Sequence, residues 1–122
     1  MPGTAGRILI VEDDPDLRGA LAAILEDAGY SIVEAEHGGE ALAHLRSGMA
    51  FCLIVLDLFM PEMNGWAFRA EQTRDPQLAP IPVVVISADS KSAERAKALG
   101  VVTALTKPVD VDRLLQVLGQ HC

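Results

Sequence analysis

Residues 52–65 read Cys-Leu-Ile-Val-Leu-Asp-Leu-Phe-Met-Pro-Glu-Met-Asn-Gly, an apolar run that ends in one carboxylate and then breaks into a turn. The run from Cys52 to Leu56 predicts a strand buried on both faces, which is typical of a parallel sheet. Asp57 follows at the carboxyl end of this strand, where open α/β sheets bind their ligands. A proline and a glycine close the turn that follows. We therefore expect the chemistry of this protein at Asp57.

Four further apolar runs alternate with segments whose apolar residues recur at helical spacing. The predicted strands are 7–11, 31–35, 52–57, 83–86 and 101–105. The predicted helices are 15–28, 38–47, 65–74, 91–99 and one that begins after residue 110, with Asp14 and Asp110 as N-caps and Gly29, Gly48 and Gly100 as stops. This alternation predicts an α/β fold: a doubly wound, five-stranded parallel sheet with five helices on its two faces.

The composition narrows the class of protein. A chain of 122 residues that is half hydrophobic and 22% charged predicts one compact domain, which we place at 7–122 after a disordered N-terminal segment, 1–6. A net charge of -7 without any basic run excludes a nucleic-acid surface. No apolar stretch approaches the ~20 residues that cross a bilayer, and the first residues lack the blocks of a signal peptide. We therefore expect a cytoplasmic protein with no direct nucleic-acid or membrane partner.

The two cysteines lie far apart in the sequence. Cys52 heads the predicted core strand, where it would serve as a small hydrophobic residue, and Cys122 is the last residue. A disulfide would have to draw a frayed end of the chain onto the core. We therefore expect free thiols and a reducing compartment.

Chemically active groups recur just beyond the carboxyl ends of four predicted strands. They are Glu12, Asp13 and Asp14 after the first strand, Asp57 after the third, Ser87 after the fourth and Lys107 after the fifth. Because parallel strands end at one edge of the sheet, these groups are expected to meet in one crevice. Crowded carboxylates there require a divalent cation with oxygen ligands, for which Mg²⁺ is the best candidate.

An aspartate between a divalent cation and a lysine can attack a phosphoryl group and form an aspartyl phosphate. Lys107 would hold the anionic group beside Asp57, and Ser87 would donate its hydroxyl to it. Taken alone, an aspartate at a strand end is more often a helix or turn cap, and Asp14 is expected to cap the first helix in either case. Four strand ends with complementary groups favour chemistry over coincidence.

The motifs that contain these residues resemble one known family. They are Val11-Glu12-Asp13-Asp14, the run from Asp57 to Gly65, Val85-Ile86-Ser87-Ala88 and Thr106-Lys107-Pro108, with a weaker match at 35–42. From about residue 7 to 119 the chain resembles the receiver domain of two-component response regulators, of the chemotaxis-regulator kind. The resemblance implies the strand order 2-1-3-4-5.

The resemblance also implies a role for each site residue. Asp57 would be the phosphoacceptor. Glu12, Asp13, Asp57 and the backbone carbonyl of Phe59 would hold Mg²⁺, while Ser87 and Lys107 would contact the phosphoryl oxygens. The Lys107-Pro108 peptide bond would be cis.

The same resemblance implies the partners. The phosphohistidine of a sensor kinase or a phosphotransfer protein would supply the phosphoryl group, and a downstream effector would receive a conformational signal. Such a protein is not an enzyme, beyond catalysing its own phosphorylation and dephosphorylation.

Two features depart from the family pattern. Ala104 stands where the family carries Tyr or Phe, three residues before Lys107, and the span from Ser87 is about two residues shorter than usual. Both fall on the surface formed by the fourth helix, fifth strand and fifth helix, through which a homodimer is also expected. We predict that phosphorylation survives and that the output uses another signal, such as loop ordering. Phe59 and Asp89 lie where the family controls the access of water to the phosphoryl group.

Three other functions are compatible with a strand-end aspartate on a sheet of this kind. A phosphatase with an aspartate nucleophile needs a second aspartate two residues after the first, where this chain has Phe59. A flavin-binding protein needs a neutral phosphate loop after the first strand, where this chain is acidic. The remaining alternative is an interaction module of receiver fold that acts without phosphorylation. Ala104 favours this alternative.

Overall fold

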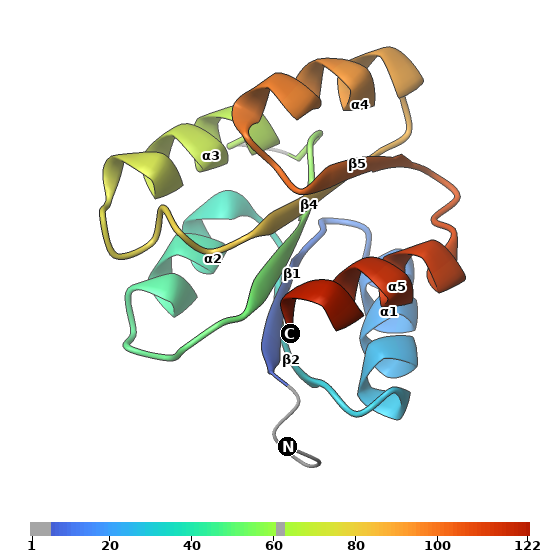
Figure 1. Ribbon diagram of the computed structural model, residues 1–122. Helices are drawn as coiled ribbons and strands as arrows, with labels where there is room; N and C mark the ends of the chain where they lie inside the picture. Colours follow the sequence, from blue (N-terminus) through green and yellow to red (C-terminus); the bar gives the residue numbers. More distant parts are fainter. Residues whose placement is uncertain (1–5, 61–62) are drawn as a thin grey trace.

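The computed structural model describes residues 6–60 and 63–122, and its centre is a parallel sheet of five strands (Figure 1). The strands are β1 (Arg7–Val11), β2 (Ser31–Ala35), β3 (Leu53–Asp57), β4 (Val83–Ser87) and β5 (Thr103–Thr106). Their order is β2-β1-β3-β4-β5, and every pairing is parallel. The predicted sheet and strand order are confirmed. Residues 1–5 of the predicted disordered segment 1–6, and the turn proline, Pro61, lie outside the described residues.

Helices cover both faces of this sheet. They are α1 (Pro15–Asp27), α2 (Gly38–Leu45), α3 (Gly65–Arg74), α4 (Ser90–Ala96) and α5 (Val111–His121). α2, α3 and α4 pack on one face, and α1 and α5 on the other (Figure 1). β3 serves both cores, because Ile54 and Leu56 face the first layer and Leu53 and Val55 the second. All five residues of β3 are buried, which confirms the prediction for Leu53 to Leu56, whereas Cys52 precedes the strand and is partly buried.

The helix ends follow the capping residues of the sequence. Asp14 accepts hydrogen bonds from the backbone N–H groups of Asp16 and Leu17, and Asp110 accepts one from Arg113, so both predicted caps are confirmed. The predicted helix 91–99 divides into α4 and a 3₁₀ turn, Lys97–Leu99. None of the helices in the described ranges combines the length and the apolar character that a membrane crossing needs.

The expectation of two free thiols is wrong, because Cys52 and Cys122 form a disulfide. α5 continues as a helix to His121, beyond its last buried residue, Leu118. This extra turn carries Cys122 to the residue that precedes β3. The two Cα atoms are 5.4 Å apart, a separation typical of disulfides.

Candidate functional site

Three acidic residues meet at the carboxyl edge of the sheet. Glu12 follows β1 and Asp57 ends the neighbouring strand β3, so the register of the two strands places them side by side. Carboxylate oxygens of Glu12, Asp13 and Asp57 all lie within 4.8 Å of one another. Asp57 is 3% exposed and Glu12 fully buried, whereas Asp13 is exposed. The structure therefore brings together the three side chains that were predicted to bind a metal ion.

Glu12 is the most confined of these carboxylates. Its Oε2 accepts a hydrogen bond from the backbone N–H of Asp14 at 3.1 Å. Its Oε1 forms an ion pair with Lys107 Nζ at 2.9 Å but has no hydrogen-bond partner among the described residues. A buried carboxylate oxygen in this state fits a cation, and three clustered carboxylates are the oxygen ligands that Mg²⁺ prefers.

Lys107, the residue that directly follows β5, extends its side chain into the same crevice. Its Nζ lies 3.6 Å from Asp57 Oδ1, and its backbone N–H donates to the carbonyl of Ser87 at 2.8 Å. The Lys107-Pro108 bond is cis, as the resemblance implied. Burial alone would lower the pKa of the Lys107 ammonium, but the carboxylates of Glu12 and Asp57 outweigh it and raise the pKa. Lys107 therefore stays charged.

The ionised form of Asp57 is disfavoured in the absence of a cation. Burial raises its pKa from 3.8 to about 7, and the neighbouring charge of Glu12 adds to the increase. Lys107 and the backbone N–H of Phe59, which donates to Oδ1 at 3.3 Å, oppose this increase without cancelling it. A cation between the carboxylates would favour the ionised form of Asp57.

Ser87 ends β4, beside Asp57, but its hydroxyl is engaged elsewhere. Ser87 Oγ accepts a hydrogen bond from the backbone N–H of Asp89 at 3.1 Å and donates to the Asp89 carbonyl at 3.2 Å. The side chain is fully buried. Asp89 itself caps α4, because its carboxylate accepts from the backbone of Lys91 and from the hydroxyl of Ser92. The hydroxyl of Ser87 thus belongs to the turn between β4 and α4.

An aromatic pair borders the crevice. The ring of Phe59 is 50% exposed and meets Trp66, on the first turn of α3, edge to face with ring centroids 5.6 Å apart. The contact of Phe59 with Trp66 was not predicted, although both residues lie within ten residues of Asp57. The role of the Phe59 carbonyl as a metal ligand stays a prediction.

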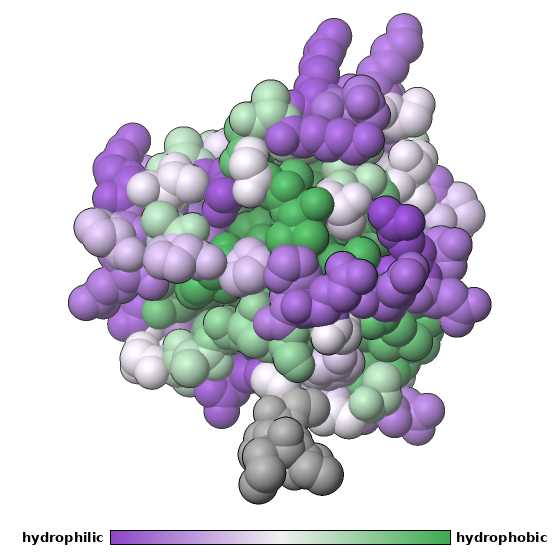
Figure 2. Space-filling model, in the orientation of Figure 1, coloured by the Kyte–Doolittle hydropathy of each residue, from purple (hydrophilic) through white to green (hydrophobic). Residues whose placement is uncertain are grey.

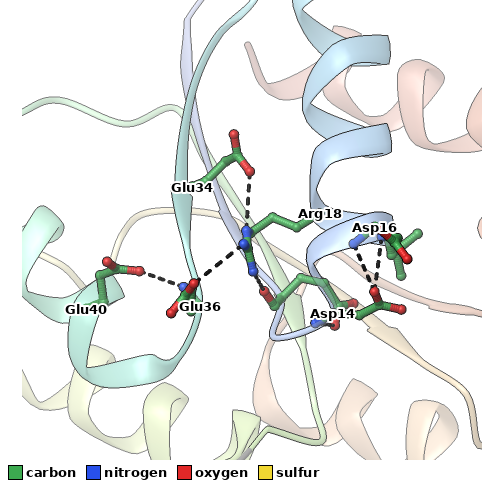
Figure 3. Close-up of polar contacts among 8 residues, drawn as sticks. Asp14, Asp16, Arg18, Glu34, Glu36 and Glu40 are labelled. Carbon is green, nitrogen blue, oxygen red and sulfur yellow. Dashed lines mark hydrogen bonds and ion pairs between the residues drawn. The ribbon is translucent and has the colours of Figure 1, made fainter.

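Arg18 was missed from the sequence, and it joins the acidic loop that follows β1 to β2 (Figure 3). From the first turns of α1, its Nη1 donates to the backbone carbonyl of Glu12 at 2.8 Å. Its Nε donates to Glu34 at 3.2 Å and its Nη2 lies 3.7 Å from Glu36. Only 13% of the Arg18 side chain is exposed. The only feature of the sequence that points to Arg18 is that it is a single arginine in a segment rich in acidic residues.

Ala104 lies on β5, opposite Val85 of β4, and is partly buried against the layer of α2, α3 and α4. Apolar side chains gather between α4 and α5 at this edge of the molecule (Figure 2). Val102 is among the exposed large hydrophobic residues there. Ala104 therefore provides no aromatic ring at the position where the family pattern has one.

Known proteins share both the sequence pattern and the fold. Residues 8–119 match the family model of the response regulator receiver domain. Protein PilH of Pseudomonas aeruginosa is 33% identical over 115 residues, which cover 93% of this chain and 94% of PilH. The chemotaxis response regulator CheY4 of Vibrio cholerae has a TM-score of 0.87 and 29% identity, over 98% of this chain and 100% of CheY4. The response regulator TrrA of Thermotoga maritima, in complex with Mg²⁺-BeF, has a TM-score of 0.85 and 27% identity over 96% and 99% of the two chains.

Together with the family match, the fold and the acidic crevice identify a doubly wound α/β signalling module. The chain belongs to the receiver-domain family of two-component response regulators.

Proposed function

We propose that Asp57 accepts a phosphoryl group from the phosphohistidine of a sensor kinase or phosphotransfer protein, with Mg²⁺ as the cofactor. The observation that carries this proposal is the cluster of Glu12, Asp13 and Asp57, whose carboxylate oxygens lie within 4.8 Å beside the ammonium of Lys107. Close carboxylates of this kind favour a bound cation. The related TrrA was solved with Mg²⁺-BeF, which supports the same use of this site.

Glu12, Asp13, Asp57 and the backbone carbonyl of Phe59 would hold Mg²⁺. When bound, the ion neutralises the charge that develops on the phosphoryl oxygens. The role of Asp57 begins with ionisation, because the carboxylate is the nucleophile and its pKa of about 7 leaves part of the population protonated without a cation. A carboxylate oxygen of Asp57 then bonds to phosphorus as the bond from phosphorus to the donor imidazole breaks, and its electron pair returns to the imidazole nitrogen.

Two side chains would receive the transferred group. Lys107 Nζ, 3.6 Å from Asp57 Oδ1, would pair with the phosphoryl oxygens. Ser87 would exchange its hydrogen bond to the Asp89 carbonyl for one to a phosphoryl oxygen, which changes the turn that leads into α4. Because Ala104 has no ring to move, we assign the conformational signal to this turn. A structure with a beryllofluoride adduct that shows a side-chain switch on β5 and an unchanged turn would contradict this assignment.

Intact-mass measurement tests the phosphoacceptor directly. The full chain is incubated with Mg²⁺ and acetyl phosphate, and we expect one phosphoryl adduct. Asp57→Asn should abolish the adduct, and the control Asp112→Asn, at an exposed position on α5, should keep it. An adduct that survives Asp57→Asn would place the phosphoacceptor elsewhere.

The second candidate function is an interaction module that acts without phosphorylation, and Ala104 is the observation that favours it. It predicts no adduct under conditions in which a control receiver reacts. Either function delivers its signal to an effector protein or domain rather than to nucleic acid. We propose the surface of α4, β5 and α5, where exposed Val102 lies, for that contact and for a homodimer.

A further inference from the structure

The disulfide joins two elements at the edge of the sheet opposite to Asp57. Cys52 directly precedes β3 and Cys122 directly follows α5, with 70 residues of sequence between them. Since a strand rises by ~3.3 Å per residue, the bridge lies roughly 16 Å from the acidic crevice. The bridge is therefore not part of the candidate phosphorylation site.

The last turn of α5 depends on this bridge for its attachment to the sheet. Leu118 is fully buried, but all residues from 119 to 122 are exposed. Gly119 also lies in this turn, and glycine is a poor helix former. The backbone N–H of Cys122 donates to the carbonyl of Leu118 at 2.8 Å, a local bond that frays easily without an anchor. Opening of the bridge would therefore release this turn while the apolar core of α5 stays packed.

The surroundings of the cysteines suit both the bonded and the reduced form. Cys122 is exposed, so a small thiol can reach its sulfur. Cys52 is partly buried, and its Sγ lies 3.4 Å from the carbonyl oxygen of Arg7, which can accept a hydrogen bond once Cys52 carries a proton. Gly6 makes room for the bridge, because a Cβ at this position would collide with Cys52 and lie 3.6 Å from the Cβ of Cys122.

We propose that Cys52 and Cys122 form a reversible redox pair that anchors the end of α5 to β3 when oxidised and releases it when reduced. The co-reactant is a low-molecular-weight disulfide. The thiolate of Cys122 attacks one of its sulfurs and expels one thiol. The thiolate of Cys52 then attacks the Cys122 sulfur of the mixed disulfide and expels the second thiol. Two protein thiols are thereby oxidised, one external disulfide is reduced to two thiols, and reduction follows the same steps in reverse.

This inference is independent of the proposed phosphorylation, and one set of samples separates them. The full chain is equilibrated with mixtures of reduced and oxidised dithiothreitol, quenched and alkylated. By mass we expect a single reversible transition between two alkylated thiols and none, with no disulfide between two copies of the chain at any stage. Uptake of a phosphoryl group from acetyl phosphate should be equal in both forms. A loss of uptake in both forms would contradict the proposed function alone.

Two further readouts test the anchoring. Closing a loop of this length should raise the Tm by about 10 °C or more, and amide exchange in residues 119–122 should be at least tenfold faster after reduction. Cys122→Ser, a substitution at an exposed position, should have the same Tm with and without reductant. The inference is overturned if the chain does not close, if it closes only between molecules, or if reduction changes neither the Tm nor the exchange.

Discussion

The two ends of β3 are stabilised in opposite ways. At the carboxyl end, Asp57 and Glu12 are buried carboxylates that repel each other, and a single ammonium group, that of Lys107, offsets them in part. At the amino end, Cys52 is covalently bonded to Cys122. The carboxyl end therefore carries buried charge that disfavours the folded state, while the amino end carries a covalent cross-link. Perturbed ionisable groups of this kind are typical of functional sites.

At the amino end, a neutral side chain holds the loop that follows α3. Gln72, fully buried on α3, donates from Nε2 to the carbonyls of Leu78 and Ile81, both at 3.0 Å. A hollow of about 320 Å³ lies beside this loop, lined by residues that carry no charge: Leu45, Gly48, Met49, Ala50, Phe51, Gln77, Leu78 and Ile81. Removal of a carboxylate at the carboxyl end should therefore raise stability and weaken Mg²⁺ binding. A substitution in the loop at the amino end should lower stability and leave Mg²⁺ binding unchanged.

The largest effect is expected for Asp57→Asn. At pH 8 without Mg²⁺, removal of the buried charge should raise the free energy of unfolding, with about 4 kcal/mol as the ceiling that the pKa shift sets. Urea unfolding measures this effect, and Asp112→Asn on the exposed side of α5 is the control. A less stable Asp57→Asn protein at pH 8 would contradict the proposed opposition between the two ends.

The free energy of unfolding should also depend on pH because of the carboxyl group of Asp57. Because the folded-state pKa of Asp57 is raised from 3.8 to about 7, the native chain binds this proton more tightly than the unfolded chain does. The stability that this proton contributes is present below about pH 4 and is lost as the pH rises to about 7. Asp57→Asn should lack this loss, and Mg²⁺ should restore stability to the unchanged protein at pH 8.

At the amino end, Gln72→Leu should have the converse effect. The substitution leaves the carbonyl of Ile81 without its side-chain donor in a partly buried loop, which costs about 1–3 kcal/mol. Mg²⁺ affinity should not change, because Gln72 lies at the other end of the sheet. Gln116→Leu, at an exposed position of α5, should alter stability by less than about 0.5 kcal/mol. Weaker Mg²⁺ binding in Gln72→Leu would show that the two ends are coupled.

What the sequence predicted follows from local patterns. The strand before Asp57 was predictable because the run from Cys52 to Leu56 has no polar position, and Leu53 to Leu56 are all buried. The acidic cluster was predictable because parallel strands end at one edge, so Glu12 and Asp57 needed no further information to be brought together.

The features that were missed depend on distances between elements. The bridge to Cys122 requires the length of α5, and its last turn has no apolar residue that would indicate a helix. Gln72 holds a loop, and because the loop sequence has no periodic pattern, its path could not be predicted. Arg18 acts across α1, β1 and β2, and spacing within α1 does not reveal partners on other strands.

The smallest effect is expected for Arg18→Gln, which tests how the carboxyl end is positioned. Arg18 touches the backbone of Glu12 rather than its carboxylate, so its loss should leave the ligands present but less well oriented. We expect Mg²⁺ affinity to fall about fivefold, or roughly 1 kcal/mol, with partial recovery in Arg18→Lys. The single tryptophan, Trp66, provides the fluorescence readout, because its ring meets Phe59 beside Asp57.

The control for Arg18 is Arg74→Gln on α3, whose side chain is 74% exposed and pairs with Glu71 at 3.3 Å. This substitution removes the same charge from the chain, so a general electrostatic effect would weaken Mg²⁺ binding equally in both variants. A loss of stability in Arg18→Gln with unchanged Mg²⁺ affinity would show that Arg18 supports only the fold. A loss of affinity confined to Arg18→Gln means that the carboxyl end needs its loop held from outside, because its own charges repel.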